Sequence, residues 1–360
     1  DGNKLSFIVD QPSNLMVKIN GQAPLLIFST PHETDVPNKN DSNVLYFGPG
    51  EHDVGRLQLQ SNQTVYLAAG ATFYGTLEGE SVENVRIMGR GILDGSKHTS
   101  WDKRIFGIYF ERSKNISIEG IGIRNCYWWV THFLLCENVK ISYINLFSYY
   151  RNNGGLMLDG CRNYNANNCF ILTNDDCICP HALNAAGNGE PLSDNYRFED
   201  MVLYNVLSGN GIRIGASFET ERCTNWLFKN IDLLTHSGAA IISDHSDWAI
   251  MENLWFVNFY DEQPYKKTID FFIDSTRYSC FTGYKSGRGN MDKLRFVNLQ
   301  SPGGDIVLRG YNGEHTFKDV HFANCRIGKN QIDDINDISI NEFVASVSFS
   351  GGSLSYQPVE

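Results

Sequence analysis

The pattern that decides the fold is Asn115-Ile116-Ser117-Ile118, and it returns as Asn138-Val139-Lys140-Ile141. Apolar and polar residues alternate in both segments, as they do in a β-strand that buries one face. Related segments recur at steps of roughly 25 to 40 residues, a spacing that suits one turn of a solenoid. Their first residues are Ile87, Ile118, Ile141, Ala166, Phe198, Phe228, Phe256, Phe296 and Phe322.

These strand-like segments are too short to bury an apolar face alone. Coils stacked on one another share one continuous core and pair their backbones through parallel ladders. No long segment shows the 3.6-residue period of an amphipathic helix. The sequence therefore predicts an all-β fold, a right-handed parallel β-helix that occupies residues 44–360, with its coils ending near residue 350.

A different pattern precedes the repeats. Residues 1–30 predict two or three strands, at 5–9, 15–19 and 25–28, and the Asn20-Gly21 turn favours a hairpin. Residues 31–43 are rich in Asp, Asn and Pro and predict a linker. We expect the short N-terminal β segment either to pair with the end of the helix or to be the remnant of a β-sandwich.

Composition excludes several classes of function. A formal net charge of −11 without a Lys/Arg block argues against nucleic acid and, more weakly, against a polyanionic polysaccharide. No apolar run approaches the roughly 18 residues that span a bilayer, and no signal-peptide pattern opens the chain. The chain is then either a mature exported protein or a cytoplasmic one, and we favour a secreted or periplasmic protein. The sequence does not indicate an oligomeric state.

The nine cysteines are scattered through the repeats. Cys177-Ile178-Cys179 does not have a zinc-ligand spacing, and no second pair completes a site. We therefore predict neither a metal nor a cofactor, and expect most cysteines to be small buried apolar residues.

The strongest functional signal is the adjacent carboxylate pair Asp175-Asp176. A general acid and a general base, both carboxyl groups, are what the hydrolysis of a glycosidic bond requires. A bare Asp-Asp pair more often ends a strand and caps a turn. The surrounding motifs decide between these two interpretations.

Four motifs, in this order and spacing, resemble the polygalacturonase family of β-helix glycosidases and its dextranase and isopullulanase relatives. They are Tyr46-Phe47-Gly48-Pro49-Gly50, Gly89-Arg90-Gly91-Ile92-Leu93-Asp94-Gly95, Asn174-Asp175-Asp176-Cys177 and Gly209-Asn210-Gly211. The resemblance spans roughly residues 44–260. It implies an inverting glycoside hydrolase in which Asp175 is the general acid and Asp176 activates water.

The chain departs from that family at three points. Gly154 stands where the family has a third Asp, and Asn210 stands where it has a His. Ala240-Ile241-Ile242 replaces the Arg-Ile-Lys that would grip a galacturonate carboxylate. Because those charge-assisted hydrogen bonds are missing, galacturonan is not the expected substrate. The losses also keep open a degenerate carbohydrate-binding protein and, less strongly, a polysaccharide lyase.

Other polar and aromatic residues in matching parts of neighbouring coils are candidates for binding a poly- or oligosaccharide. They are Trp129, His132, Asn153, His181, Asn210, Arg213, Glu219, Asp244 and His245. Each has a plainer alternative: a structural histidine, a mutual Arg213–Glu219 ion pair, or a polar turn at 244–245. For Trp128-Trp129 we expect at least one ring to face outward, because neighbouring strand residues point to opposite faces. Asp159 is either a displaced third carboxylate or a turn residue before Gly160.

Overall fold

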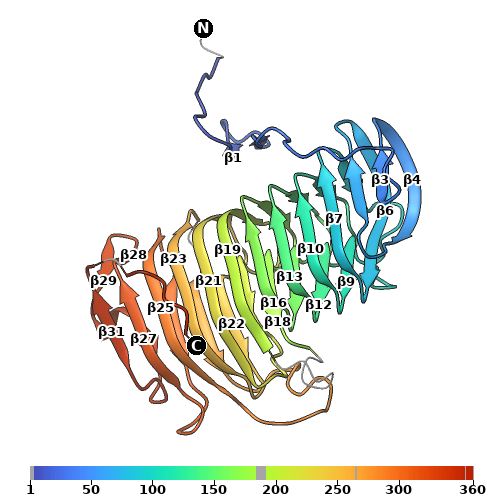
Figure 1. The fold of residues 1–360 in the computed structure, drawn as a ribbon. Helices are drawn as coiled ribbons and strands as arrows, with labels where there is room; N and C mark the ends of the chain where they lie inside the picture. Colours follow the sequence, from blue (N-terminus) through green and yellow to red (C-terminus); the bar gives the residue numbers. More distant parts are fainter. Residues whose placement is uncertain (1–3, 184–191, 264–265, 353, 360) are drawn as a thin grey trace.

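The computed structural model describes residues 4–183, 192–263, 266–352 and 354–359. The chain winds into a long coil of strands, each turn stacked on the one before, from blue to red in Figure 1. In each turn the chain passes through up to three parallel sheets, here named sheets I, II and III. This right-handed parallel β-helix confirms the predicted fold class.

Several strands bend at a corner and serve two sheets: β4 and β6 serve sheets II and III, and β19, β21, β23 and β25 serve sheets I and II. Sheet I contains β3 (Val44–Phe47), β5 (Thr64–Leu67), β7 (Glu83–Gly89), β10 (Lys114–Glu119), β13 (Glu137–Ser142), β16 (Arg162–Asn167), β19 (Leu192–Asn205), β21 (Arg222–Thr235), β23 (Ile250–Asp261), β25 (Asn290–Ser301), β27 (Phe317–Ala323) and β31 (Val347–Ser350). Sheet II adds β4 (Gly50–Gln58), β6 (Ala71–Glu80), β8 (Ile92–Asp94), β11 (Gly122–Arg124), β14 (Asn145–Phe147), β17 (Phe170–Thr173) and β28 (Cys325–Ile327), with β29 (Asn330–Ile332) antiparallel to β28. Sheet III adds β9 (Ile108–Glu111), β12 (Thr131–Leu134), β15 (Leu156–Asp159), β18 (Ile178–His181), β20 (Ile212–Ile214), β22 (Ala239–His245), β24 (Lys267–Ile273), β26 (Asp305–Arg309) and β30 (Ser339–Ile340); a 3-10 helix, η2 (Ile335–Asp337), precedes β30.

The nine repeat segments align in the structure as the sequence predicts. Their first residues pair from coil to coil in sheet I and point into the core. In the C-terminal half the aligned residue is phenylalanine, and the rings of Phe198 and Phe228 stack with centroids 5.0 Å apart. Such stacks bury large apolar area in every coil and fix the strand register.

Asparagines at the corners explain the Asn-punctuated pattern. Asn230, Asn258, Asn298 and Asn324 follow their sheet I segments with φ between 50° and 54°, a left-handed conformation that asparagine tolerates better than most residues. Each donates its side-chain amide to the same position one coil earlier, at 2.7 to 2.8 Å. The ladder turns the chain sharply and links successive coils.

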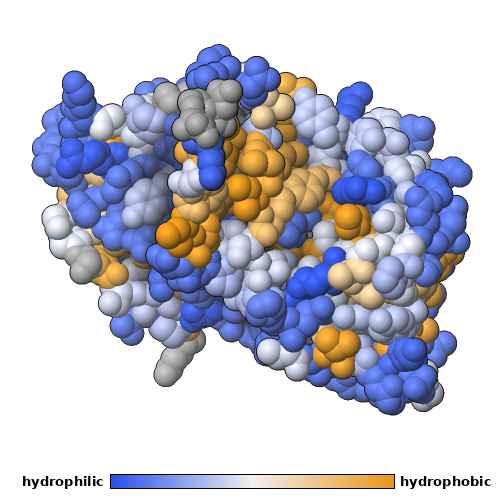
Figure 2. Space-filling view, turned by 90° about the horizontal axis from the view of Figure 1, so that it is seen from above, coloured by the Kyte–Doolittle hydropathy of each residue, from blue (hydrophilic) through white to orange (hydrophobic). Residues whose placement is uncertain are grey.

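The N-terminal segment forms a hairpin of β1 (Asn14–Val17) and β2 (Leu25–Phe28), while the predicted strand at 5–9 does not form. The Phe28 ring contacts Phe147 and Phe170 at 5.2 and 5.1 Å. The hairpin therefore packs on the flank made by sheet II and does not pair with the end of the helix. Figure 2, which views the molecule from above, shows apolar residues gathered on this face, ringed by hydrophilic ones.

All nine cysteines lie in the described part of the chain, where they are unpaired, and eight of them are buried. This confirms their expected role as small apolar residues. No helix among the described residues is long and apolar enough to cross a membrane.

Candidate active site

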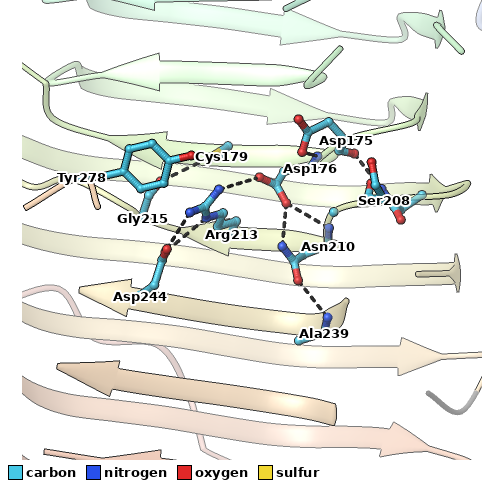
Figure 3. Close-up of polar contacts among 12 residues, drawn as sticks. Asp175, Asp176, Cys179, Ser208, Asn210, Arg213, Gly215, Ala239, Asp244 and Tyr278 are labelled. Carbon is cyan, nitrogen blue, oxygen red and sulfur yellow. Dashed lines mark hydrogen bonds and ion pairs between the residues drawn. The ribbon is translucent and has the colours of Figure 1, made fainter. Parts of the chain in front are cut away.

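Asp175 and Asp176 stand in the turn between β17 and β18, where sheet II passes to sheet III. Asp175 is half-buried, and Asp176 is only 3% exposed. Figure 3 shows both side chains with partners from the two coils that follow. Asp176 is thus buried, beside the half-buried side chains of Asn210 and Arg213.

Hydrogen bonds from within the turn and from the next coil hold it in place. Thr173 Oγ1 and Asn205 Nδ2 both donate to the carbonyl of Asp175, at 2.6 and 2.7 Å. The Asp175 carboxylate accepts the backbone N–H of Asp176 at 2.8 Å. Asp175 thus caps its own turn, as the plainer interpretation expected, while Asp176 makes a different set of contacts.

Gly209 explains why a glycine follows in the next coil. Its φ of +96° is left-handed, and a Cβ there would lie 2.7 Å from the Asp175 carbonyl carbon and the Asp176 nitrogen. Only a residue without a side chain lets the two coils approach this closely. The Gly209-Asn210-Gly211 motif therefore fits directly against the acid pair.

The Asp176 carboxylate is bound by the next coil. Asn210 donates both its backbone N–H and its side-chain amide to Asp176 Oδ1, at 2.9 and 2.7 Å. The other oxygen, Oδ2, lies 3.5 Å from Arg213 Nη1. Asn210 Oδ1 in turn accepts the N–H of Ala239, which fixes the amide orientation. These donors match the needs of an ionised carboxylate.

Arg213 links Asp176 to a third carboxylate. Its guanidinium donates to both oxygens of Asp244, with Nε–Oδ1 at 3.1 Å and Nη2–Oδ2 at 2.5 Å. Arg213 and Asp244 come from neighbouring strands of sheet III, and the Tyr278 ring lies 5.6 Å from the guanidinium carbon. The predicted alternative, an ion pair of Arg213 with Glu219, is wrong.

Burial and neighbouring charges shift the pKa values of Asp175, Arg213 and Asp244. It raises the pKa of Asp175 to about 7, and the neighbouring Asp176 carboxylate adds to the rise. Burial alone would lower the pKa of Arg213, but Asp244 and Asp176 raise it further above its usual range. Burial also raises the pKa of Asp244, and Arg213 offsets part of that rise. The site thus combines a carboxyl that titrates near neutrality with a permanent cation.

Gly154 stands at the position of the family's third Asp, and another side chain occupies the space beside it. A Cβ built at Gly154 would lie 2.4 Å from the Met157 sulfur, so the Met157 side chain occupies the space where an aspartate would begin. Met157 points out of sheet III and is 3% exposed. The missing carboxylate is therefore not restored at its own position.

A second polar cluster lies on the outer face of sheet III, in β12, β15 and β18. Asp159 is 1% exposed and accepts from His132 Nε2 and His181 Nδ1, each at 2.5 Å. The N–H of Leu183 donates to the same carboxylate at 3.0 Å. Burial alone would raise the pKa of Asp159, but the two imidazoles, His181 first, hold it well below its usual range. Asp159 is thus neither a turn residue nor bonded to the acid pair.

Trp129 packs against this second cluster. Its ring centroid lies 5.1 Å from that of His132 and 5.5 Å from that of His181. The rings of Trp128 and Trp129 stack at 5.5 Å, because residues 125–130 form a loop between β11 and β12. The strand alternation assumed for this pair is therefore absent, and neither ring belongs to the main core cluster. Trp129 is half-buried, and Trp128 is buried.

Three predicted ligands do not reach the outer face. Asn153 and His245 are 0% exposed and Glu219 is 1% exposed. Asn153 accepts the N–H of Asn174, and the His245 ring bonds to the Ala249 carbonyl. Glu219 accepts the N–H of Thr282 at 2.7 Å. Their geometry corrects the predicted substrate contacts to structural roles.

Tyr278, which no sequence motif indicates, approaches Arg213 from the loop at 274–289. Two buried carboxylates hold this loop: Asp247 accepts the N–H of Cys280 at 2.6 Å, and Glu219 binds Thr282. Ser217 Oγ also donates to the Tyr278 carbonyl. The contacts join residues about 30 to 60 positions apart, and only coil stacking brings them together.

The comparisons with known proteins identify the family of this β-helix. The profile of glycosyl hydrolases family 28 matches residues 30–217. Because this match covers more than half of the chain, the protein belongs to glycosyl hydrolases family 28 and is a glycoside hydrolase. No curated protein gives a significant sequence match.

Two solved structures resemble the whole coil. A hyperthermoactive exopolygalacturonase from Thermotoga maritima is 18% identical, with a TM-score of 0.56 over 88% of this chain and 86% of that one. A family 28 exopolygalacturonase from Yersinia enterocolitica is 13% identical, with a TM-score of 0.49 over 93% of this chain and 79% of that one. At such identities the first likeness supports the β-helix fold alone.

Proposed function

We propose that the protein hydrolyses O-glycosidic bonds of a polysaccharide or oligosaccharide with inversion, using Asp175 as general acid and Asp176 as general base. The observation that carries this proposal is the unequal environment of the two carboxyl groups. Burial and a neighbouring carboxylate raise the pKa of Asp175 to about 7, so it can hold a proton to donate. Asn210 and Arg213 surround Asp176 with donors that suit the ionised form, which can activate water.

The surroundings of Arg213 support a substrate other than galacturonan. Ala240 and Ile242 offer no charge in the coil that follows Arg213. Arg213 itself is shared between Asp244 and Asp176, which neutralise its charge. A galacturonate carboxylate would therefore have to displace one of these partners, at a cost in desolvation and lost hydrogen bonds. A neutral or atypical glycan avoids that cost.

Trp129, in the loop between β11 and β12, supplies an aromatic ring that packs against His132 and His181 of sheet III. We assign this ring to stacking on a sugar ring. A cavity of about 280 Å³ lies toward the N-terminal coils, lined in part by Phe106 and Tyr109. The rings of Phe106 and Trp129 lie 6.1 Å apart. These neighbouring aromatic rings support a glycan path that leads from the acid pair along sheet III toward the N-terminal coils. We place this activity outside the cytoplasm, since a polymeric glycan is more accessible there.

A second function, carbohydrate binding without catalysis, is favoured by the Met157 side chain at the place of the third Asp. One assay separates the candidates. Purified protein is incubated with pullulan, dextran, polygalacturonate and branched pectic polysaccharides, and reducing ends and unsaturated products are measured in parallel. The proposal predicts reducing ends without unsaturated products from a substrate other than polygalacturonate. Unsaturated products would identify a lyase, and binding without release of reducing ends would identify a binding protein.

A further inference from the structure

The cluster of Asp159, His132 and His181 has no part in the proposed acid–base mechanism, yet it buries a charge. Both Asp159 oxygens are engaged, and the residue is 1% exposed. A buried ionic network of this kind is weak evidence for stability, because well-packed apolar residues of similar volume often do as well or better. Its geometry therefore points to a role other than holding the coils together.

His132 cannot serve as a sugar ligand in this arrangement. Its Nε2 is bound to Asp159, and its Nδ1 is buried without a hydrogen-bond partner among the described residues. Because Nδ1 is buried and Nε2 is engaged, neither ring nitrogen is accessible to a sugar hydroxyl. What His132 does offer is ring contact: an edge-to-face contact with Trp129, with centroids 5.1 Å apart, and a tilted contact with Phe106, with centroids 4.9 Å apart.

His181 makes the same pair of contacts from another coil. Its Nδ1 bonds to Asp159, and its ring lies 5.5 Å from Trp129. One carboxylate thus fixes the orientation of two imidazoles, and both imidazoles touch one indole. Trp129 itself stands in a loop, where no strand pairing holds its side chain. The two imidazoles supply that constraint from the sheet below.

We propose that Asp159 is a positioning residue, which acts through His132 and His181 to hold the Trp129 ring in the orientation that stacks on a sugar. The proposal rests on the proposed function only in the statement that Trp129 contacts the glycan. A ring that is fixed before binding loses less conformational freedom when the sugar arrives, and binding is tighter by that amount. The cluster therefore acts on affinity and leaves the acid–base step alone.

The first test needs no glycan. The fluorescence of Trp129 is obtained as the difference between a protein and its Trp129→Phe variant, in the wild-type and in the Asp159→Asn backgrounds. In Asp159→Asn, this difference signal should become about twice as sensitive to acrylamide, because a loosened ring is exposed for more of the time. The matched control is Asp270→Asn, a buried carboxylate on the same sheet face with cationic partners, Lys267 and Arg309. It should leave the Trp129 signal unchanged.

An unchanged Trp129 signal in Asp159→Asn would overturn the proposal. If Asp159→Asn does not fold, His181→Gln decides the matter, since a glutamine can still donate to Asp159 but removes the ring face from Trp129. It should give the same gain in acrylamide sensitivity. A folded His181→Gln with the wild-type signal would likewise overturn the proposal.

The second test asks whether Asp159 acts through Trp129. Affinity electrophoresis in gels that contain pullulan, dextran or polygalacturonate measures retardation of wild type, Trp129→Ala, Asp159→Asn and the double variant. Asp159→Asn should weaken retardation by at most about tenfold, and should add nothing in the Trp129→Ala background. Additive losses would show that the histidines contact sugar directly and would overturn the proposal. If wild type neither binds nor cleaves any glycan, the proposed function fails, and the fluorescence test alone decides on Asp159.

Discussion

Two carboxylates near sheet III, the half-buried Asp175 and the buried Asp159, have pKa shifts of opposite direction. Burial and a like charge raise the pKa of Asp175 to about 7, whereas two imidazoles hold that of Asp159 well below its usual range despite its burial. Burial raises the pKa in both cases, and the charge of the neighbouring groups decides whether that rise is kept, as at Asp175, or reversed, as at Asp159. Asp175 is able to exchange a proton near neutral pH, and Asp159 is locked as an ion.

The two regions also differ in how coil stacking builds them. At the corner of sheets II and III, the next coil adds Asn210 and Arg213, and the coil after it adds Asp244. On the outer face of sheet III, coils before and after β15 supply the two histidines on either side of Asp159. At the corner, these partners set the electrostatic environment of the acid pair. On sheet III, Asp159 bonds to the two histidines and fixes the orientation of their imidazole rings.

The largest expected effect is on turnover at the corner. Asp175→Asn and Asp176→Asn should each lower kcat by about 10³-fold or more, because an amide can neither donate nor accept the required proton. Glycan binding should change little, since the amide keeps the shape of the carboxyl group. Steady-state rates on the glycan that is cleaved in the panel give the measurement. Asp159→Asn serves as the contrast and should keep kcat within a few-fold of wild type; near-normal turnover in either corner variant would refute the assigned roles.

The next effect is on stability at the second region. Asp159→Asn should lower the free energy of unfolding by about 3 kcal/mol at pH 7, because two buried imidazoles lose their anion. The folded-state pKa of Asp159 is depressed, so its contribution is fully present above the unfolded value near 4 and is lost progressively as pH falls from there through the lower folded-state pKa. Urea unfolding at pH 7 and pH 3.5 checks this. A difference between the variant and wild type that grows toward acid pH would contradict the ion pair.

A backbone test sharpens the account of the corner. Gly209→Ala places a Cβ 2.7 Å from the Asp175–Asp176 peptide and should cost roughly 2 to 3 kcal/mol together with most of the activity. Gly283→Ala is the matched control: its φ is also positive, at +72°, but nothing lies within 4 Å. It should cost only about 1 kcal/mol. Equal losses in thermal unfolding would show that the close approach of the coils is unimportant.

The smallest expected effect is a gain in stability, where the other substitutions cause a loss. The raised pKa of Asp175 means that the folded state binds this proton more tightly than the unfolded one, so stability falls as pH rises from about 4 through about 7. Asp175→Asn removes the charge and should stabilise the protein by roughly 1 to 2 kcal/mol at pH 8, with no gain at pH 4. Melting temperatures at the two pH values test this. Equal stability of variant and wild type at pH 8 would mean that the folded state does not disfavour the ionised form of Asp175.

Much of the fold could be predicted because one strand pattern repeats. The segments that begin at Ile118 and Phe228 stack in register as the sequence indicates, since the same residue types must face the same core in every coil. Asp175 and Asp176 could be found because they are neighbours within one motif. Trp128 and Trp129 were misread, since a loop does not alternate as a strand does.

Contacts between coils could not be predicted from the sequence alone. Arg213 and Asp244 were both candidates, yet their pairing depends on which strands meet in sheet III. For Asp159 the sequence leaves open both a displaced third carboxylate and a turn residue, because the end of β15 cannot be located without the structure. Tyr278 reaches Arg213 from a long loop whose course is set by buried partners far away in sequence. Residue types can be read from the sequence, but which residues of successive coils lie side by side cannot.

The central claim is that Asp175 and Asp176 act as separate acid and base across one glycosidic bond. Proton NMR of the first sugar anomer released from the cleaved glycan tests it most directly, in a time course short enough to precede mutarotation. The account predicts that the first product has the anomeric configuration opposite to that of the substrate linkage, because water attacks from the side opposite the leaving group. A first product that retains the configuration would require a covalent intermediate and would contradict this division of roles.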